Sequence, residues 1–304
     1  MRILLTGCAG FIGSKVAEVL LAEGHTVVGI DNVNAAYDRR LKEWRLAQLA
    51  GRAGFFFHRA DITDREALDA LSLDGAVDAV VNLAARAGVR QSVGDPWIYE
   101  QTNVVGTLNL LEFCRARSIG KFVLASTSSL YGALTPRPFQ EDADTNRPLS
   151  PYAASKKAAE VLSYTYHYLY GLDVTVVRYF TVYGPAGRPD MSIFRFIQWI
   201  SEGRPVIVYG DGTMERDFTF VEDVARGTVA ALRPLGYEII NLGSDHPVTV
   251  REVIAQIEAR VGAPARVEFH PAHPADVAAT WASISKAGRL LAWTPHTPFT
   301  DGLD

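Results

Sequence analysis

A tyrosine and a lysine four residues apart are the first pair in this sequence whose types could do chemistry together. Tyr152 and Lys156 lie in the segment SPYAASKKAAE, and their spacing places both side chains on one face of a helix. A nearby ammonium group stabilises a phenolate, so Lys156 would lower the pKa of the Tyr152 phenol and make it a usable base near neutral pH. The same spacing also arises by chance, so the pair needs support from the rest of the chain.

Support comes from a run of hydroxyl side chains upstream of the pair. The segment STSSLYG, residues 126–132, begins with four consecutive hydroxyl residues and contains no acidic side chain. A hydroxyl at Thr127, ending a strand, could share a substrate hydroxyl with Tyr152. The alternative is a polar strand end that runs into a turn.

Glycines near the N-terminus predict a nucleotide site. The segment TGCAGFIGS places Gly7, Gly10 and Gly13 between an expected strand and an expected helix, where backbone amides and a helix N-terminus can face a pyrophosphate. A tight structural turn would also select glycine. Asp31, ending the second strand, can accept hydrogen bonds from both ribose hydroxyls and would repel a 2′-phosphate, so NAD is favoured over NADP. Asp61, ending the third strand, contacts the adenine edge or caps the next helix.

These residues are spread over alternating strands and helices. Helix-like apolar spacing occurs at 15–24 and 106–118, between short apolar runs. The alternation predicts an α/β fold with a doubly wound, Rossmann-like parallel sheet that is covered on both faces. The expected strands are residues 2–7, 26–31, 54–61, 79–85, 121–127 and 174–180.

The amino-acid composition and the pattern of expected elements change after Phe180. Residues 183–192 are rich in glycine and proline, and a helix is expected at 249–261. The sequence therefore predicts a Rossmann domain over 1–179 and a smaller α/β substrate lobe over 180–304. Segments near 216–243 are expected to return to the first domain.

The composition of the chain argues against some other classes of protein. The 304 residues have a formal net charge of −4, which gives no electrostatic case for binding nucleic acid. No signal peptide or membrane-spanning run is recognisable, and no metal-binding motif is expected. The only two cysteines are expected to be reduced thiols, which suits the cytoplasm.

Taken together, these motifs resemble the extended short-chain dehydrogenase/reductase superfamily, and within it the nucleotide-sugar 4-epimerases. Beside the segments above, the resemblance rests on NLAA (82–85), Asn103 with Gly106, and RYFTVYGP (178–185). It implies NAD dependence, with Tyr152 as the base, Lys156 holding the nicotinamide ribose, and Thr127 supporting proton transfer. The cofactor contacts it implies are Gly7, Gly10, Phe11, Ile12, Gly13, Asp31, Asn32, Asn34, Asp61, Ile62, Leu83, Ala84, Ala85, Asn103, Tyr152, Lys156 and Tyr179.

The run of hydroxyl residues and a later arginine narrow the range of possible substrates. Similar dehydratases and decarboxylases carry an acid where this chain has Ser128 and Ser129, whereas an epimerase needs no acid beyond the tyrosine. The segments 31–49, 86–92 and 178–191 resemble UDP-glucuronate 4-epimerases, and GRPDM contains Arg188. Thr181 stands where UDP-glucose epimerases usually have asparagine. The resemblance implies that Arg188, Thr181, Ser128 and Ser129 bind the uronate carboxylate; for Arg188, the alternative is a solvated loop residue.

Other positions correspond to the UDP end of the substrate. Arg216 and Asp276 match family contacts to phosphate and ribose, and Arg90 is a weaker phosphate candidate. The alternative for Arg216 and Asp276 is a surface ion pair or cap. His273 departs from the arginine common in epimerases, which puts diphosphate binding on that side in doubt.

Three alternative functions stay open. They are a 4-epimerase of UDP-glucose or UDP-N-acetylglucosamine, a UDP-glucuronate decarboxylase, and a non-catalytic NAD sensor. The family resemblance also implies a homodimer, in which helices near 98–117 and 152–170 form a four-helix bundle. The aromatic segment SYTYHYLYG (163–171) fits that interface, but could equally belong to a core.

Overall fold

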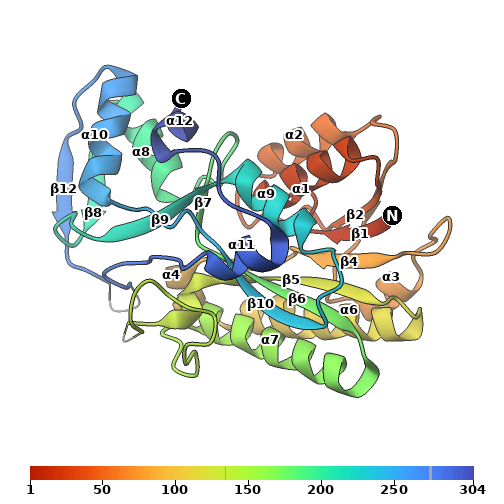
Figure 1. Ribbon diagram of the computed structural model, residues 1–304. Coiled ribbons are helices and arrows are strands. Elements are labelled where there is room, and N and C mark those ends of the chain that lie inside the picture. Colours follow the sequence, from red (N-terminus) through yellow and green to blue (C-terminus); the bar gives the residue numbers. More distant parts are fainter. Residues whose placement is uncertain (134, 274–275) are drawn as a thin grey trace.

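A computed structural model describes residues 1–133, 135–273 and 276–304. Its centre is a sheet of seven parallel strands in the order β10-β6-β5-β4-β1-β2-β3 (Figure 1). This order confirms the predicted doubly wound fold. The strands are β1 (Arg2–Thr6), β2 (Thr26–Asp31), β3 (Phe55–Arg59), β4 (Ala79–Asn82), β5 (Lys121–Thr127), β6 (Asp173–Tyr179) and β10 (Tyr237–Leu242).

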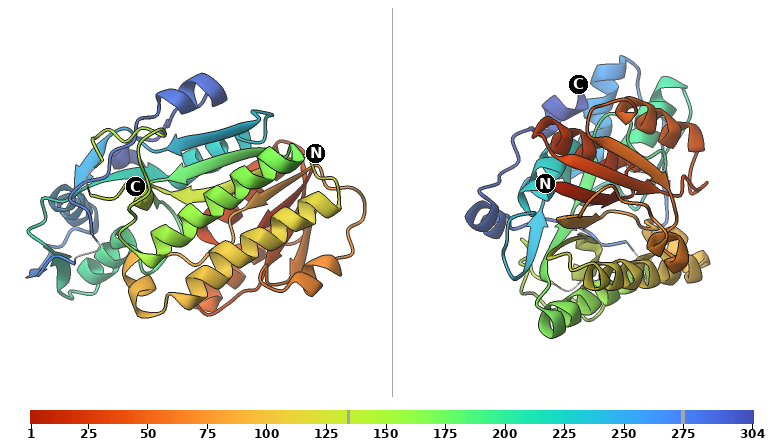
Figure 2. Two further views of the ribbon diagram at one scale, coloured as in Figure 1. Left: turned by 90° about the horizontal axis from the view of Figure 1, so that it is seen from below. Right: turned by 90° about the vertical axis from the view of Figure 1, so that its right-hand side faces the viewer.

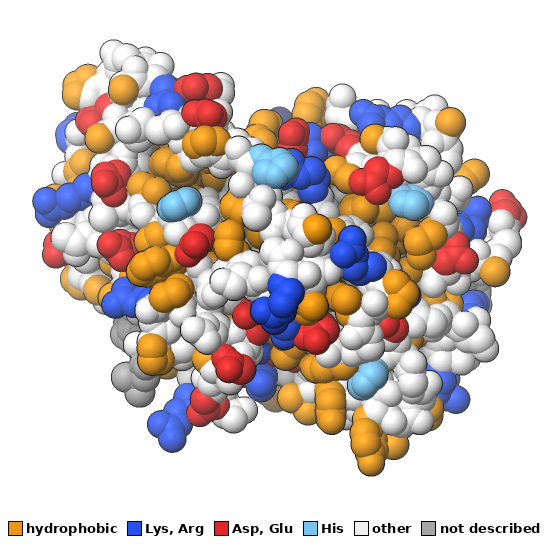
Figure 3. All heavy atoms as spheres, viewed as in Figure 1, with side chains coloured by type: hydrophobic (Ala, Val, Ile, Leu, Met, Phe, Trp, Pro, Cys, Tyr) orange, Lys and Arg blue, Asp and Glu red, His pale blue; other side chains and the backbone are white. Residues whose placement is uncertain are grey.

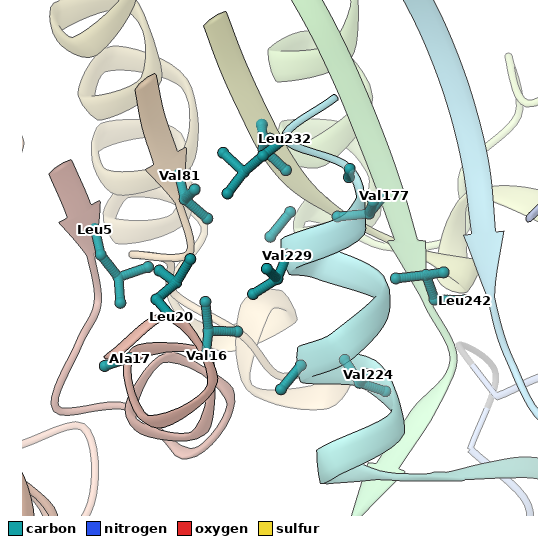
Figure 4. Close-up of a cluster of buried hydrophobic side chains, with 14 of the residues drawn as sticks. Leu5, Val16, Ala17, Leu20, Val81, Val177, Val224, Val229, Leu232 and Leu242 are labelled. Atoms are coloured by element: carbon teal, nitrogen blue, oxygen red, sulfur yellow. The ribbon is translucent and has the colours of Figure 1, made fainter. Parts of the chain in front are cut away.

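Helices cover both faces of this sheet because its inner strands are apolar on both sides. Along β1, Ile3 and Leu5 point into one core cluster, whereas Leu4 points into the other. Figure 4 shows the first cluster, in which Val16 and Leu20 of α1 face Val229 of α9. The helices on that face are α1 (Phe11–Ala22), α2 (Arg39–Leu49), α9 (Val221–Ala230) and α11 (Ser285–Leu291). Those on the other are α3 (Arg65–Asp69), α6 (Gly106–Ala116) and α7 (Pro151–Tyr170).

The second lobe has its own small sheets and its own core. Its apolar cluster includes Ile193, Phe196 and Ile257, contributed by helices that pack together beside the two sheets. One sheet contains β11 (Pro247–Thr249), β9 (Glu215–Phe220) and β7 (Thr181–Tyr183), and the other β12 (Val267–His270) and β8 (Val206–Tyr209). The helices are α8 (Ser192–Ser201), α10 (Val250–Val261) and α12 (Phe299–Leu303).

The chain crosses between the lobes more than once. After β9 in the second lobe, α9 packs against α1 and β10 pairs with β6 at the edge of the large sheet. The segment between 216 and 243 therefore contributes to both lobes.

The helix expected at 98–117 is present as a continuous helical run from Trp97 to Ala116, but it contains a π-helical turn. Before α6 come α4 (Val89–Gly94), α5 (Trp97–Tyr99) and a π-helical turn, η1 (Glu100–Val105). Such turns insert a residue into a helix and often occur at functional sites. Here the turn carries Asn103, whose side chain reaches the loop after β4.

Local signals set the start of α7, on which Tyr152 lies. Ser150 caps the helix by accepting a hydrogen bond from the Ala153 amide (3.2 Å), and Pro151 occupies its first turn. At the other end Gly171 adopts φ +67°, a conformation in which glycine is not strained. No helix among the described residues is long and apolar enough to cross a bilayer.

Candidate functional site

A cavity of about 640 Å³ lies at the carboxyl ends of the central strands and between the two lobes. Nearly every predicted site residue lines it, from segments far apart in the sequence. Those residues are Gly7, Gly10, Phe11, Ile12, Gly13, Asp31, Asn32, Asn34, Asp61, Ile62, Leu83, Ala84, Ala85, Thr127, Ser128, Ser129, Tyr152, Lys156, Tyr179, Thr181, Arg188, Arg216 and Asp276.

The glycine turn brings the start of α1 to the cavity. Gly7 has φ +71°, and a Cβ there would lie 2.7 Å from the Ala84 amide nitrogen. A Cβ at Gly10 would lie 2.9 Å from the Gly7 carbonyl oxygen, and one at Gly13 would overlap that same oxygen. The turn itself therefore needs these glycines, and it also exposes a helix N-terminus to a ligand phosphate.

Asp31 and Asp61 form the acidic end of the cavity. The Asp31 carboxylate accepts hydrogen bonds from the amides of Ala9 (3.1 Å) and Val33 (2.8 Å), which fix it beside the glycine turn. Asn32 donates to Asp61 (2.6 Å). Asp61 does not cap α3, because Asp64 accepts the capping bond instead. This arrangement fits the ribose and adenine end of the expected dinucleotide.

Tyr152 stands between two groups that favour its ionised form. Burial raises the pKa of its phenol, whereas the Thr127 hydroxyl and the charge of Arg188 oppose that rise. Thr127 also accepts a hydrogen bond from the Ser129 amide (3.1 Å), which holds the strand end in place. The predicted association of Tyr152 and Thr127 is therefore present in the cavity.

Lys156 is anchored to the central sheet. Its ammonium group donates to the carbonyl of Ala125 on β5 (2.9 Å), and burial lowers its pKa to about 8. The charge of Arg188 lowers the pKa of the Tyr152 phenol, and the expected contribution of Lys156 to that lowering stays a prediction. Lys156 still lines the same cavity as Tyr152.

Arg188 is not a solvated loop residue. Only 24% of its side chain is exposed, and its guanidinium pairs with Asp190, with Nη2 lying 2.5 Å from Oδ2. Asp190 belongs to the GRPDM segment but had no predicted role. The pairing could have been suspected from the two-residue spacing of opposite charges.

A second arginine, also missed from the sequence, holds the loop that carries Arg188. Arg45 of α2 is buried and donates to the carbonyls of Ala9 (3.2 Å) and Ala186 (2.5 Å). It also bonds to the hydroxyl of Tyr37 (2.6 Å), which lines the cavity. Arg45 thus ties the glycine turn to the loop before Arg188.

The predicted contacts to the UDP end lie together on the second-lobe side. Asp276 and Arg216 line the cavity, and burial lowers the pKa of the Arg216 guanidinium. Arg90, from α4, forms an ion pair with Asp276 (2.5 Å) and lies 3.9 Å above the ring of Tyr209. The pair joins the two lobes at this end of the cavity.

Asn103 does not line the cavity, unlike the other expected cofactor contacts. Its amide exchanges hydrogen bonds with the backbone of Arg86 (2.9 and 3.0 Å) and donates to Ser155 (2.9 Å). These bonds brace the loop after β4 against α7. Arg86, which was not among the predicted site residues, lines the cavity in its place. No group of metal-binding side chains is present in the described parts of the chain.

The sequence matches the model of the NAD dependent epimerase/dehydratase family over residues 3–243. This chain belongs to that family. It is 56% identical over 301 residues to a UDP-glucuronate 4-epimerase of Thermodesulfobacterium geofontis, covering 99% of this chain and 93% of the relative. These findings confirm an NAD-dependent enzyme of the epimerase type.

Solved structures agree with this assignment. A UDP-glucuronic acid 4-epimerase from Bacillus cereus, in complex with UDP-glucuronic acid and NAD, matches with a TM-score of 0.92 and 39% identity. The match covers 100% of this chain and 96% of that one. A Thermus thermophilus UDP-glucose 4-epimerase in complex with NAD gives a TM-score of 0.89 and 35% identity over the same shares.

Proposed function

We propose that this protein converts UDP-glucuronate to UDP-galacturonate by NAD-dependent epimerisation at C4. The choice of UDP-glucuronate as substrate rests on the position of Arg188, a cation on the wall of the same cavity as Tyr152. The relative of Thermodesulfobacterium geofontis and the Bacillus cereus structure support the same substrate.

In this proposal Tyr152 takes the proton from the substrate O4 and later returns it. The glycine turn and Asp31 would hold NAD, which would supply an acceptor for the C4 hydride and its return to the opposite face of the ring. Thr127 shares the O4 hydrogen bond with Tyr152, and Lys156 holds the nicotinamide ribose. Between the two transfers the 4-keto sugar turns about its diphosphate linkage.

The uronate carboxylate requires its own binding groups whenever the C4 ketone is positioned for hydride transfer. Oxidation at C4 makes a β-keto acid, which loses CO₂ when its carboxylate bond aligns with the π orbitals of the carbonyl. In this proposal Arg188, Thr181, Ser128 and Ser129 hold the carboxylate away from that alignment. The hydroxyls bind without supplying an acid that would promote elimination.

The remaining contacts follow from the lining of the cavity. Arg216 would bind the diphosphate, Asp276 the uridine ribose, and Arg90 would orient Asp276 through their ion pair. The cofactor would lie along the glycine turn, Asp31 and Asp61, with the remaining proposed contacts at Phe11, Ile12, Asn32, Asn34, Ile62, Leu83, Ala84, Ala85 and Tyr179.

We further propose the division into a Rossmann domain (1–179) and a substrate lobe (180–304), with α9 and β10 returning to the first. A homodimer through α6 and α7 and a cytoplasmic location complete the proposal. The two buried, unpaired cysteines suit a reducing compartment.

The decisive experiment is incubation of the purified protein with UDP-glucuronate, without added cofactor, followed by NMR for UDP-galacturonate. UDP-glucose and UDP-N-acetylglucosamine are the matched neutral substrates. Appearance of the galacturonate signal supports the proposal. Preference for a neutral sugar, or a UDP-pentose as the main product, would assign the chain to another activity.

A further inference from the structure

The carboxylate of Asp190 lies against the cation that would bind the substrate. Both its oxygens are used, since Nε of Arg188 lies 3.1 Å from Oδ1 and Nη2 lies 2.5 Å from Oδ2. The two side chains are 24% and 23% exposed, and Asp190 lines the cavity beside Arg188. This arrangement places a resident carboxylate where a substrate carboxylate is expected to bind.

The geometry leaves one edge of the guanidinium for a second carboxylate. Asp190 takes the edge formed by Nε and Nη2, and Nη2 also approaches the carbonyl oxygen of Ala87 at 3.5 Å. Nη1 makes no hydrogen bond to any residue that the structure describes. An arginine has five N–H donors in a planar fork, so it can hold a carboxylate on each of two edges.

The charged groups around Arg188 determine how strongly it can bind a second carboxylate beside Asp190. Lys42 and Arg45 are nearby cations that act on Arg188. Tyr37, Tyr99 and Tyr152 are nearby phenols. Asp190 is the carboxylate that pairs with it. Two carboxylates on one guanidinium repel each other, so Asp190 weakens the binding of any second one.

We propose that Asp190 is the resident counter-ion of Arg188 and lets the uronate leave and return while the keto sugar turns. This inference rests on the proposed function. The pair is partly buried, so removing one partner leaves the other charge without full compensation from solvent. With Asp190 in place, the guanidinium keeps a partner whenever the substrate carboxylate departs. The substrate carboxylate is therefore bound more weakly, and the keto sugar turns faster, than if Arg188 had no carboxylate partner.

The test replaces Asp190 by asparagine, which keeps its shape and removes its charge. In Asp190→Asn we expect the Kd of UDP-glucuronate to fall about tenfold. The kcat for its epimerisation should also fall about tenfold, because release of the carboxylate becomes slower. Binding of UDP-glucose, which has no carboxylate, should change by less than about twofold. Asp190→Ser removes the same charge with a smaller side chain and must give the same pattern.

Other results would overturn the inference. A weaker binding of UDP-glucuronate in Asp190→Asn would show that Asp190 only orients the guanidinium. Equal losses of binding affinity for UDP-glucuronate and UDP-glucose would show that Asp190 has a purely structural role. Tighter binding of UDP-glucuronate with an unchanged kcat would show that Asp190 does not affect the rotation of the keto sugar. In an Arg188→Ala background, Asp190→Asn should change binding of UDP-glucuronate by less than about twofold. If the unmodified protein does not epimerise UDP-glucuronate, the proposed function itself fails.

Discussion

At the scale of single residues, the reacting phenol depends on its neighbours in space more than on its neighbours in sequence. Burial alone would make the Tyr152 phenol a poor base, since it raises the pKa. Thr127, at the end of β5, and Arg188, from the second lobe, both act against that effect. Sequence spacing predicted the partnership with Thr127, whereas the contribution of Arg188 depends on how the lobes meet.

Replacing Thr127 by valine should shift the pH dependence of the reaction. Loss of the hydroxyl removes an interaction that lowers the pKa of Tyr152, so this pKa rises further. A base with a higher pKa is deprotonated only at higher pH, and the acid limb of the kcat/KM profile should therefore move to higher pH. Thr127→Ser keeps the hydroxyl and should restore the original profile. An unshifted profile in the valine variant would contradict this role.

Replacing Arg188 by alanine should affect charged and neutral substrates differently. Hydrogen bonds to charged groups are worth about 1.5–3 kcal/mol, so kcat/KM for UDP-glucuronate should fall by about 10- to 100-fold. The fraction of UDP-pentose formed by loss of CO₂ should rise, which NMR of the products measures. Binding of UDP-glucose is the control and should change little. Full turnover without any decarboxylated product would refute the carboxylate clamp.

At the scale of elements, a buried ion pair fixes α7 against the sheet. Glu160, one turn after Lys156, accepts hydrogen bonds from Arg178 of β6 (2.8 and 2.9 Å) and from Ser126 of β5 (2.6 Å). Both charged side chains are almost fully buried. The pair therefore joins the helix that carries Tyr152 to the strands that end at the cavity.

Breaking this pair on one side should destabilise the protein strongly. Glu160→Gln leaves Arg178 charged and buried without its carboxylate, and we expect the free energy of unfolding to fall by about 3–5 kcal/mol. The matched control is Glu202→Gln, which breaks the exposed pair with Arg204 and should leave the free energy of unfolding nearly unchanged. Urea unfolding of both variants measures the difference. Equal small losses would show that the buried pair does not hold α7.

At the scale of the whole molecule, one outer face is unusually apolar for a surface. Helices α6 and α7 run side by side across it (Figure 2), and hydrophobic side chains gather over the end of α7 (Figure 3). The exposed apolar residues of these helices are Leu108, Val161, Tyr164, Tyr168, Leu169 and Tyr170. Exposed apolar surface of this kind is typical of an interaction site, which supports the proposed dimer, whereas Tyr166 of the same segment packs into the core.

A charge in the middle of that face should separate the proposed dimer. Val161 is 53% exposed on α7, and Trp44 is equally exposed on α2, away from this face. Val161→Glu should convert the dimer to a monomer in sedimentation velocity because a carboxylate would be buried in the interface. Trp44→Glu should leave the dimer intact. A monomeric unmodified protein would disprove the interface.

By itself, the sequence determined the order of strands and helices, the glycine turn, and the placement of Thr127 at the end of a strand and Tyr152 at the start of a helix. These features depend on short-range periodicity and backbone conformation, which a linear chain carries directly. Only the tertiary structure decided that Lys156 faces a strand carbonyl, that Arg90 pairs with Asp276, and that Asn103 braces a loop. Side-chain partners of this kind join segments far apart along the chain, so they are set by the packing of the two lobes.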